Sequence, residues 1–154
     1  MFQLNLPAYQ FRIKQDKKSN LILDTFRKRY VKLTPEEWVR QNFLEFLAQE
    51  KGFSKALMAV ETQLTVNTMK KRCDAVFYDI QGNPSIILEF KAPNVEITQS
   101  VFDQVAVYNS KLNVKYFIVS NGMVHYFCRV NTENAQYEFF NGIPSYEEFY
   151  TLIS

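Results

Sequence analysis

The amino-acid sequence predicts an α/β fold in which a mixed central β-sheet is flanked by helices. The chain has 154 residues, the length of one ordinary domain, with 47% hydrophobic and 22% charged residues. After two short N-terminal β pieces, helical and strand-like segments follow in the order αβββαββ. We therefore expect one domain, with a β extension at 1–33, a core at 34–130 and a C-terminal extension at 131–154.

The first helix has the clearest start signal. Thr34 suits the N-cap, Pro35 suits the first helical position, and Glu37 completes a T-x-x-E capping box. Apolar residues then recur at helical spacing, and Gly52 is placed to end the helix. These signals predict a helix between Thr34 and Gly52.

The other elements follow from residue alternation, turn residues and a second capping box. The segment QGNP at 81–84 predicts a hairpin turn between two strands, and Ser145 with Glu148 predicts the start of a closing helix. The expected strands are 9–14, 20–24, 57–66, 73–80, 85–91, 114–120 and 124–130, and the further helices are 98–112 and 145–153.

Composition and motifs exclude several classes of protein. Cys73 and Cys128 are too few for a disulfide framework and lack the spacing of a zinc site. The first residues lack a basic start followed by an apolar run, so they do not predict a signal peptide. Because no apolar stretch is long enough to span a membrane, we expect a cytoplasmic protein with no membrane partner.

Positive charge is concentrated in two segments, although the formal net charge is only +2. Eight basic and two acidic residues lie between Arg12 and Lys32, and a second basic cluster comprises Lys70, Lys71 and Arg72. Such clusters can follow the phosphates of a nucleic acid. A solvated face is the alternative that charge alone leaves open.

An acid and a base project together from an apolar strand. Glu89 and Lys91 are two residues apart in IILEFKAP, so they point to the same face of a sheet. Leu88 and Phe90 then point to the opposite face, which we expect to be core. The hairpin brings Asp74, at the start of the preceding strand, alongside the acid and the base.

Two interpretations fit this D…ExK arrangement. In the first, Asp74 and Glu89 hold Mg²⁺, or Mn²⁺ in its place, and Lys91 positions or activates a water molecule near a phosphate. In the second, Lys91 simply pairs with an acid in a salt bridge, an arrangement that arises easily by chance. The three residues by themselves leave both interpretations open.

The context of these residues resembles a known family. The segments LTPEEWVRQ, KKRCDAVFYD, ILEFKAP, QVAVYN and YFIVSNG occur in this order between Leu33 and Gly122. They resemble the N-terminal domain of type I restriction enzyme R subunits, within the PD-(D/E)xK nuclease superfamily. The resemblance implies a restriction-endonuclease-like core and a metal-dependent deoxyribonuclease that uses Asp74, Glu89 and Lys91.

The chain departs from the family pattern at two points. Cys73 stands where the nominal proline of the motif precedes the aspartate, but that proline carries no chemistry. The sequence also contains no GxxxxGK[ST] phosphate-binding loop, whereas R subunits continue into a DNA-translocating motor. We therefore expect the chain to act without a motor of its own.

The resemblance also implies roles for residues outside the triad. Gln104 and Tyr108 form a Q-x-x-x-Y pair on one helix face, and similar pairs in R subunits and RecB-like nucleases lie beside the catalytic site. The family tends to place an acid of the first helix near the metal. We favour Glu36 over Glu37 as this metal ligand, because Glu36 lies nearer the apolar stripe and Glu37 serves the capping box. The basic cluster at 70–72 is expected to contact DNA phosphates.

The favoured function is an Mg²⁺-dependent DNA endonuclease or nuclease module related to restriction. DNA is the expected partner, with a separate motor or specificity subunit, or a second copy of the chain, as further candidates. One alternative is a non-cleaving nucleic-acid-binding or assembly module that retains the nuclease fold. Another is a protein–protein interaction domain whose triad is only an ion pair. Divalent-cation binding distinguishes the nuclease from this last alternative.

Overall fold

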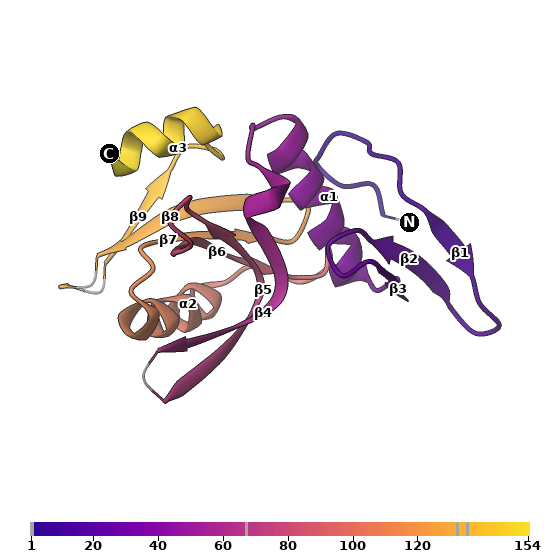
Figure 1. The fold of residues 1–154 in the computed structure, drawn as a ribbon, viewed down its shortest axis with the longest axis horizontal. Helices are drawn as coiled ribbons and strands as arrows, with labels where there is room; N and C mark the ends of the chain where they lie inside the picture. The colour runs from indigo at the N-terminus through magenta and orange to yellow at the C-terminus, as the bar shows by residue number, and fades with distance from the viewer. Residues whose placement is uncertain (1, 67, 132, 135) are drawn as a thin grey trace.

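The protein folds into two β-sheets and a set of helices that pack on the larger sheet (Figure 1). A computed structural model describes residues 2–66, 68–131, 133–134 and 136–154. The elements are β1 Ile13–Gln15, β2 Asn20–Asp24, β3 Arg29–Lys32, α1 Pro35–Gln49, a 3₁₀ turn Lys55–Leu57, β4 Met58–Val66, β5 Met69–Tyr78, β6 Pro84–Phe90, α2 Gln99–Leu112, β7 Tyr116–Ser120, β8 His125–Asn131, β9 Gln136–Phe140 and α3 Tyr146–Ile153.

The central sheet is mixed, as the sequence predicts. Its six strands run in the order β4-β5-β6-β7-β8-β9, and β6 and β7 are parallel whereas every other neighbouring pair is antiparallel. The parallel pair needs a crossover connection, which α2 supplies. Hairpins between β4 and β5 and between β5 and β6 place three strands of the site region side by side.

The central sheet is covered on both faces, which gives the molecule two apolar cores. Phe43 of α1 and Phe149 of α3 pack against one face, together with Leu88 of β6. Phe102 and Val105 of α2 pack against the other face. Burial on both faces explains why the middle strands read as nearly continuous apolar runs, with all five residues of β7 buried. Among the described residues, no helix has the length and apolar character that a membrane crossing requires.

Residues 13–32 contribute a separate antiparallel sheet of three strands in the order β1-β2-β3. This N-terminal sheet lies beside α1, on the opposite side of that helix from α2 and α3 (Figure 1). Ile22 and Asp24 of β2 are 0% and 2% exposed, so one face of the small sheet is covered. The N-terminal sheet therefore extends the domain beyond the central sheet.

The N-termini of α1 and α3 show which of the predicted N-caps and capping boxes form in the structure. Thr34 Oγ1 accepts a hydrogen bond from the Glu37 N–H at 3.1 Å, so the predicted N-cap is confirmed. The side chain of Glu37, however, turns toward arginine rather than completing the capping box. The second predicted box is complete, since Ser145 and Glu148 each bind the backbone of the other.

Several boundaries differ from the sequence-based expectation. Strand β5 begins at Met69 rather than Cys73, and the first β piece is the short β1 rather than 9–14. Strands β3 and β9 were not predicted. Both pair at a sheet edge and leave most of their residues exposed or half-buried, so neither shows the apolar run that marks an inner strand.

His125 joins the N-terminal segment to the central sheet. Its Nε2 lies 2.9 Å from the carbonyl oxygen of Asn5, and its Nδ1 lies 2.7 Å from Ser120 Oγ. The carbonyl requires a donor at Nε2, so in neutral His125 the Nδ1 atom accepts a hydrogen bond from the Ser120 hydroxyl. Burial lowers the pKa of His125 from its ordinary value of 6.5, although the Asn5 hydrogen bond acts in the opposite direction.

The protein should lose stability as the pH falls below 6.5 toward the lowered pKa of folded His125. In that window the unfolded chain binds a proton that the native imidazole does not, with a slope of at most about 1.4 kcal/mol per pH unit. Urea unfolding across this range should show the slope, and His125→Gln should remove it, since the chain contains one histidine. An unchanged slope in the variant would contradict this account of His125.

Candidate functional site

Asp74 lies directly beside the ExK segment, as the sequence predicts. Its Oδ2 accepts a hydrogen bond of 2.8 Å from the backbone N–H of Phe90, the residue between Glu89 and Lys91. The β5–β6 register pairs Ala75 with Leu88, and one further step places Asp74 opposite Glu89. The hairpin thus brings the aspartate to the strand that carries the other two residues of the triad.

The two faces of β6 carry different side chains. Leu88 and Phe90 are 1% and 3% exposed and belong to the core under α1, which confirms their predicted direction. Ile87 belongs to the core under α2, so by alternation Glu89 and Lys91 project toward the α2 side. Both are half-buried. Convergence of Asp74, Glu89 and Lys91 on one ion stays a prediction.

Strands β4 and β5 change face at Asp74. Cys73 packs in the core under α2 and Ala75 in the core under α1, although residues two apart normally share a face. The β4–β5 register runs through this point and places Glu61 opposite Asp74. Glu61 has φ 51°, in the left-handed region that non-glycine residues rarely adopt. Such local distortions redirect side chains and are frequent beside functional sites.

A small acidic pocket opens at this irregularity. Its volume is about 80 Å³, and its lining residues are Thr34, Glu36, Glu37, Arg40, Glu61, Asp74 and Phe90. The lining therefore consists of four carboxyl groups, one guanidinium group, one other polar side chain and one aromatic ring. An excess of carboxylates attracts a cation, and carboxylate oxygens are ligands that Mg²⁺ prefers.

A chain of alternating charges runs through the pocket wall. Its members, called here the ion-pair chain, are Asp24, Arg27, Glu37, Arg40, Glu61 and Arg72. Arg40 stands at its centre: Nε lies 3.0 Å from Glu37 Oε2, Nη2 pairs with Glu37 Oε1, and Nη1 lies 2.6 Å from Glu61 Oε1. The chain links the N-terminal sheet, α1 and the β4–β5 hairpin.

The pKa values of this chain show how strongly its members interact. Burial lowers the pKa of the Arg40 guanidinium, but hydrogen bonds and charges from Glu37 and Glu61 outweigh it and raise the pKa overall. Burial raises the pKa of Glu61, yet the bonds from Arg40 and Arg72 bring it below its ordinary value of 4.5. Both groups are therefore held in their charged forms.

The structure buries the second of the two acids that begin α1, which the sequence did not predict. Glu37 was expected to serve the capping box and to lie farther than Glu36 from the apolar stripe, but it is 7% exposed and pairs with Arg27 and Arg40. Glu36 is exposed, although it also lines the pocket. The expectation was wrong because it placed the side chains by the apolar stripe of the helix, whereas Glu37 is buried by its ion pairs. The assignment of Glu36 to a metal stays a prediction.

The remaining predicted residues are only partly placed. Gln104 is exposed on α2, next to the buried Val105. Arg72 is 70% exposed and its Nε lies 2.7 Å from Glu61, and Lys70 is exposed. The side chains of Tyr108 and Lys71 lie outside the described residues. Within the part of the chain that the structure describes, no three His, Cys, Asp or Glu side chains form a group able to hold a metal ion.

Sequence reasoning singled out neither Arg40 nor Glu61. Glu61 bridges two arginines at the site. The only sequence signal for Arg40 was its place one turn after Glu36 and Glu37, which puts a guanidinium within reach of an i−3 carboxylate. The link to Glu61 joins residues 21 apart in the chain and depends on tertiary structure.

The fold and the site together define a mixed α/β domain with an acid-lined pocket where two strands of a central sheet change face. A family model described as the type I restriction enzyme R protein N terminus (HSDR_N) matches residues 35–144. The chain belongs to this family, and it is a restriction-related R-subunit domain, as the resemblance in the sequence predicts.

A solved structure has a similar fold. It is the fragment structure of a proposed HsdR subunit of a type I restriction enzyme from Vibrio vulnificus YJ016, with a TM-score of 0.56 and 17% sequence identity. The match covers 79% of this chain and 25% of that chain, so this chain spans about a quarter of the length of the other. No curated protein matches the chain.

Replacing Arg40 should destabilise the fold far more than replacing Arg72, although each gives one guanidinium to Glu61. Arg40→Met leaves Glu37 buried without its nearest counter-charge, which typically costs about 3–5 kcal/mol. Arg72→Met removes a surface ion pair, which contributes about 1 kcal/mol or less. Urea unfolding of the two variants measures the difference.

Arg72→Met serves as the matched control for Arg40→Met. Adding Glu37→Leu to Arg40→Met should recover part of the lost stability, because the uncompensated charge is then absent. Equal destabilisation by Arg40→Met and Arg72→Met would show that burial of the Arg40–Glu37 pair does not matter.

Proposed function

We propose that the chain is a metal-dependent nuclease domain that hydrolyses phosphodiester bonds in DNA. One observation carries the proposal: the carboxylate of Asp74 accepts a hydrogen bond from the backbone of the ExK strand and lines a pocket together with three other acids. The match to an R-subunit N-terminal domain supports the same reaction class, since restriction requires DNA cleavage. A PD-(D/E)xK core with the triad Asp74, Glu89 and Lys91 is the proposed site.

Asp74 and Glu36 line the pocket with carboxylate oxygens, the ligands that a hard divalent cation prefers, and Glu89 lies opposite Asp74 on the neighbouring strand rather than in the pocket lining. Asp74 and Glu89 would hold Mg²⁺ or Mn²⁺, and Glu36 would complete the set from α1. A bound divalent ion stabilises negative charge on a phosphate and lowers the pKa of a bound water. Glu37 is a weaker candidate ligand, because both of its oxygens already accept hydrogen bonds from arginine.

The other residues of the site would act on the substrate. Lys91 is half-buried beside Glu89, where an ammonium group can position a water molecule or face a phosphate oxygen. Gln104 and Tyr108 of α2 would orient the DNA strand, and Lys70, Lys71 and Arg72 would contact its phosphates. A separate motor or specificity subunit, or a second copy of the chain, would complete a restriction complex.

A second candidate is a nucleic-acid-binding or assembly module that keeps the fold without cleaving. The observation that favours it is the ion-pair chain, in which Arg40 already compensates Glu37 and Glu61 without a metal. Asp74 and Glu36 lie outside that chain, however, and leave the pocket with more acids than bases. The excess negative charge is the reason for favouring the nuclease.

Purified protein should cleave plasmid DNA with Mg²⁺ or Mn²⁺ and not with EDTA. Asp74→Asn, Glu89→Gln and Lys91→Ala should each abolish cleavage, because the carboxylates hold the ion and the lysine acts on the water. Glu147→Gln and Lys115→Ala are matched controls on distant exposed residues and should cleave like the wild type. Cleavage that survives all three site variants would refute the triad.

Metal binding should separate the roles within the triad. By calorimetry, the wild type should bind Mn²⁺, Asp74→Asn and Glu89→Gln should bind it weakly or not at all, and Lys91→Ala should bind it normally, since lysine is not a ligand. A wild type that binds metal at Asp74 but cleaves nothing would point to a missing partner. A wild type that binds no metal would leave the triad as an ion pair.

A further inference from the structure

The N-terminal sheet carries a dense and nearly uncompensated positive charge. Between residues 12 and 32 seven basic side chains are exposed: Arg12, Lys14, Lys17, Lys18, Lys28, Arg29 and Lys32. Asp16 is the exposed acid of this segment. Asp24, the other acid, is 2% exposed and is neutralised by Arg27, whose Nε lies 2.5 Å from its Oδ2. The arrangement leaves a cationic surface on which Asp16 is the exposed counter-charge from the same segment.

The strand register gathers part of this charge on one face. Lys14 pairs with Leu21, and Leu21 pairs with Lys32, so the two lysines lie in one row across the three strands. Tyr30 occupies the next row of the same face, and the Lys14 Nζ lies 4.1 Å from its ring centroid. Ile22 belongs to the opposite, covered face. The face of Lys14 and Lys32, called here the basic face, is open to solvent.

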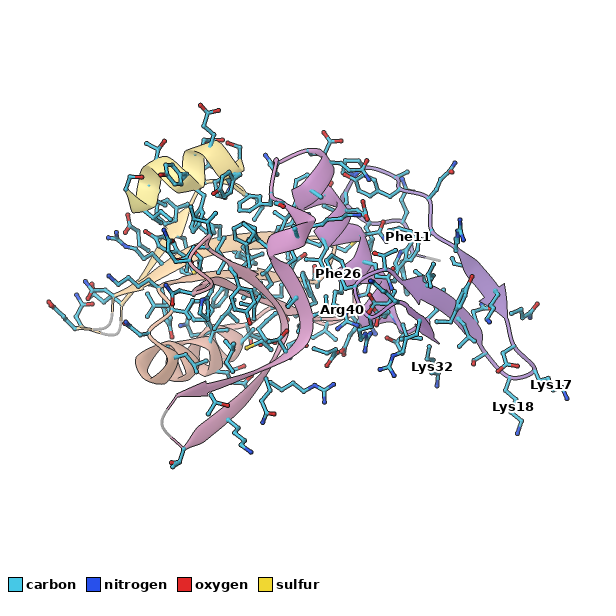
Figure 2. The ribbon with its side chains drawn as sticks, in the orientation of Figure 1. Phe11, Lys17, Lys18, Phe26, Lys32 and Arg40 are labelled. Atoms are coloured by element: carbon cyan, nitrogen blue, oxygen red, sulfur yellow. The ribbon has the colours of Figure 1, made fainter. Side chains whose placement is uncertain are left out.

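The charge continues from the basic face toward both ends of the sheet. Figure 2 shows Lys17 and Lys18 at the end of the β1–β2 hairpin, projecting away from the body, with Lys32 between that end and Arg40 in this view. Lys32 lies two residues before Thr34, which caps α1 and lines the acidic pocket. The strand that carries Lys32 of the basic face therefore leads directly into the helix that lines the candidate site.

We propose that the basic face and the β1–β2 hairpin bind the phosphate backbone of duplex DNA and hold it across the acidic pocket. This inference rests on the proposed function and names a binding surface for the same substrate. Clustered lysines and arginines neutralise phosphates without reading sequence. A single strand would instead call for several open aromatic platforms, and on this face Tyr30 is already covered by Lys14.

The position of the pocket suits a duplex held from two sides. Glu61 and Asp74 lie along the β4–β5 hairpin, which projects from the body in a different direction from the β1–β2 hairpin (Figure 1). Lys70 and Arg72, on the outer part of the β4–β5 hairpin, are exposed. The acidic pocket takes Glu61 and Asp74 from the β4–β5 hairpin and Thr34 from the start of α1, so a duplex held across it would meet positive charge on the β4–β5 hairpin and on the basic face that precedes α1.

The test is a titration of a fluorescently labelled duplex in EDTA, so that no cleavage occurs, at several KCl concentrations. The triple variant Lys17→Gln/Lys18→Gln/Lys32→Gln should bind about tenfold or more weakly, and its salt slope should fall by about one per lost phosphate contact. The control Lys55→Gln/Lys115→Gln/Arg129→Gln removes the same charge from other surfaces and should bind like the wild type. Thermal melting confirms that both variants fold.

Each outcome separates this inference from the proposed nuclease. Asp74→Asn should bind the duplex at least as well as the wild type, because the lost carboxylate repels phosphate. If the first triple variant binds like the wild type, or no more weakly than the control, the basic face is not the DNA surface. That result would not contradict the proposed nuclease function, which the cleavage assay tests separately. If single-stranded DNA binds more tightly than the duplex, or the wild type binds no duplex, the inference is overturned. Loss of binding in the first variant alone supports it, even if no cleavage is seen.

Discussion

The buried pairing of Arg40 with Glu37 is the interaction on which the arrangement of this domain depends. Charged groups this far from water need partners, and each partner here comes from a different part of the chain. Through Arg27 the pair reaches the N-terminal sheet, and through Glu61 it reaches the β4–β5 hairpin. One ion pair on α1 therefore sets how the small sheet, the helix and the central sheet meet.

The break in strand alternation at Glu61 and Asp74 explains why the pocket lies where it does. A sheet covered on both faces leaves little room for acids within its strands, and the alternating positions of β6 are filled by two apolar cores. Where β4 and β5 change face, neither core is continuous and polar side chains can reach solvent. The left-handed backbone of Glu61 is part of the same distortion.

Charge is distributed over the molecule in a pattern that suits a polyanionic substrate and a cation. The pocket holds an excess of carboxylates, while exposed lysines and arginines lie on the N-terminal sheet and the β4–β5 hairpin. In the proposed function, phosphates would meet the basic hairpins and a divalent ion would enter the acid-lined pocket. Arg40 lowers the pKa of Glu61 and keeps that acid charged within the pocket, so a bound metal would add to the charge compensation that Arg40 already provides.

Local sequence determined the helices, the inner strands and the hairpin that sets Asp74 beside Glu89 and Lys91. Caps, turns and two-residue alternation act over a few residues, so they can be read without a structure. The direction of Glu37, the role of Arg40 and the place of Glu61 were decided by tertiary structure. Each depends on a charged partner brought from another element, and the burial that makes such pairs necessary exists only after the sheets and helices have packed.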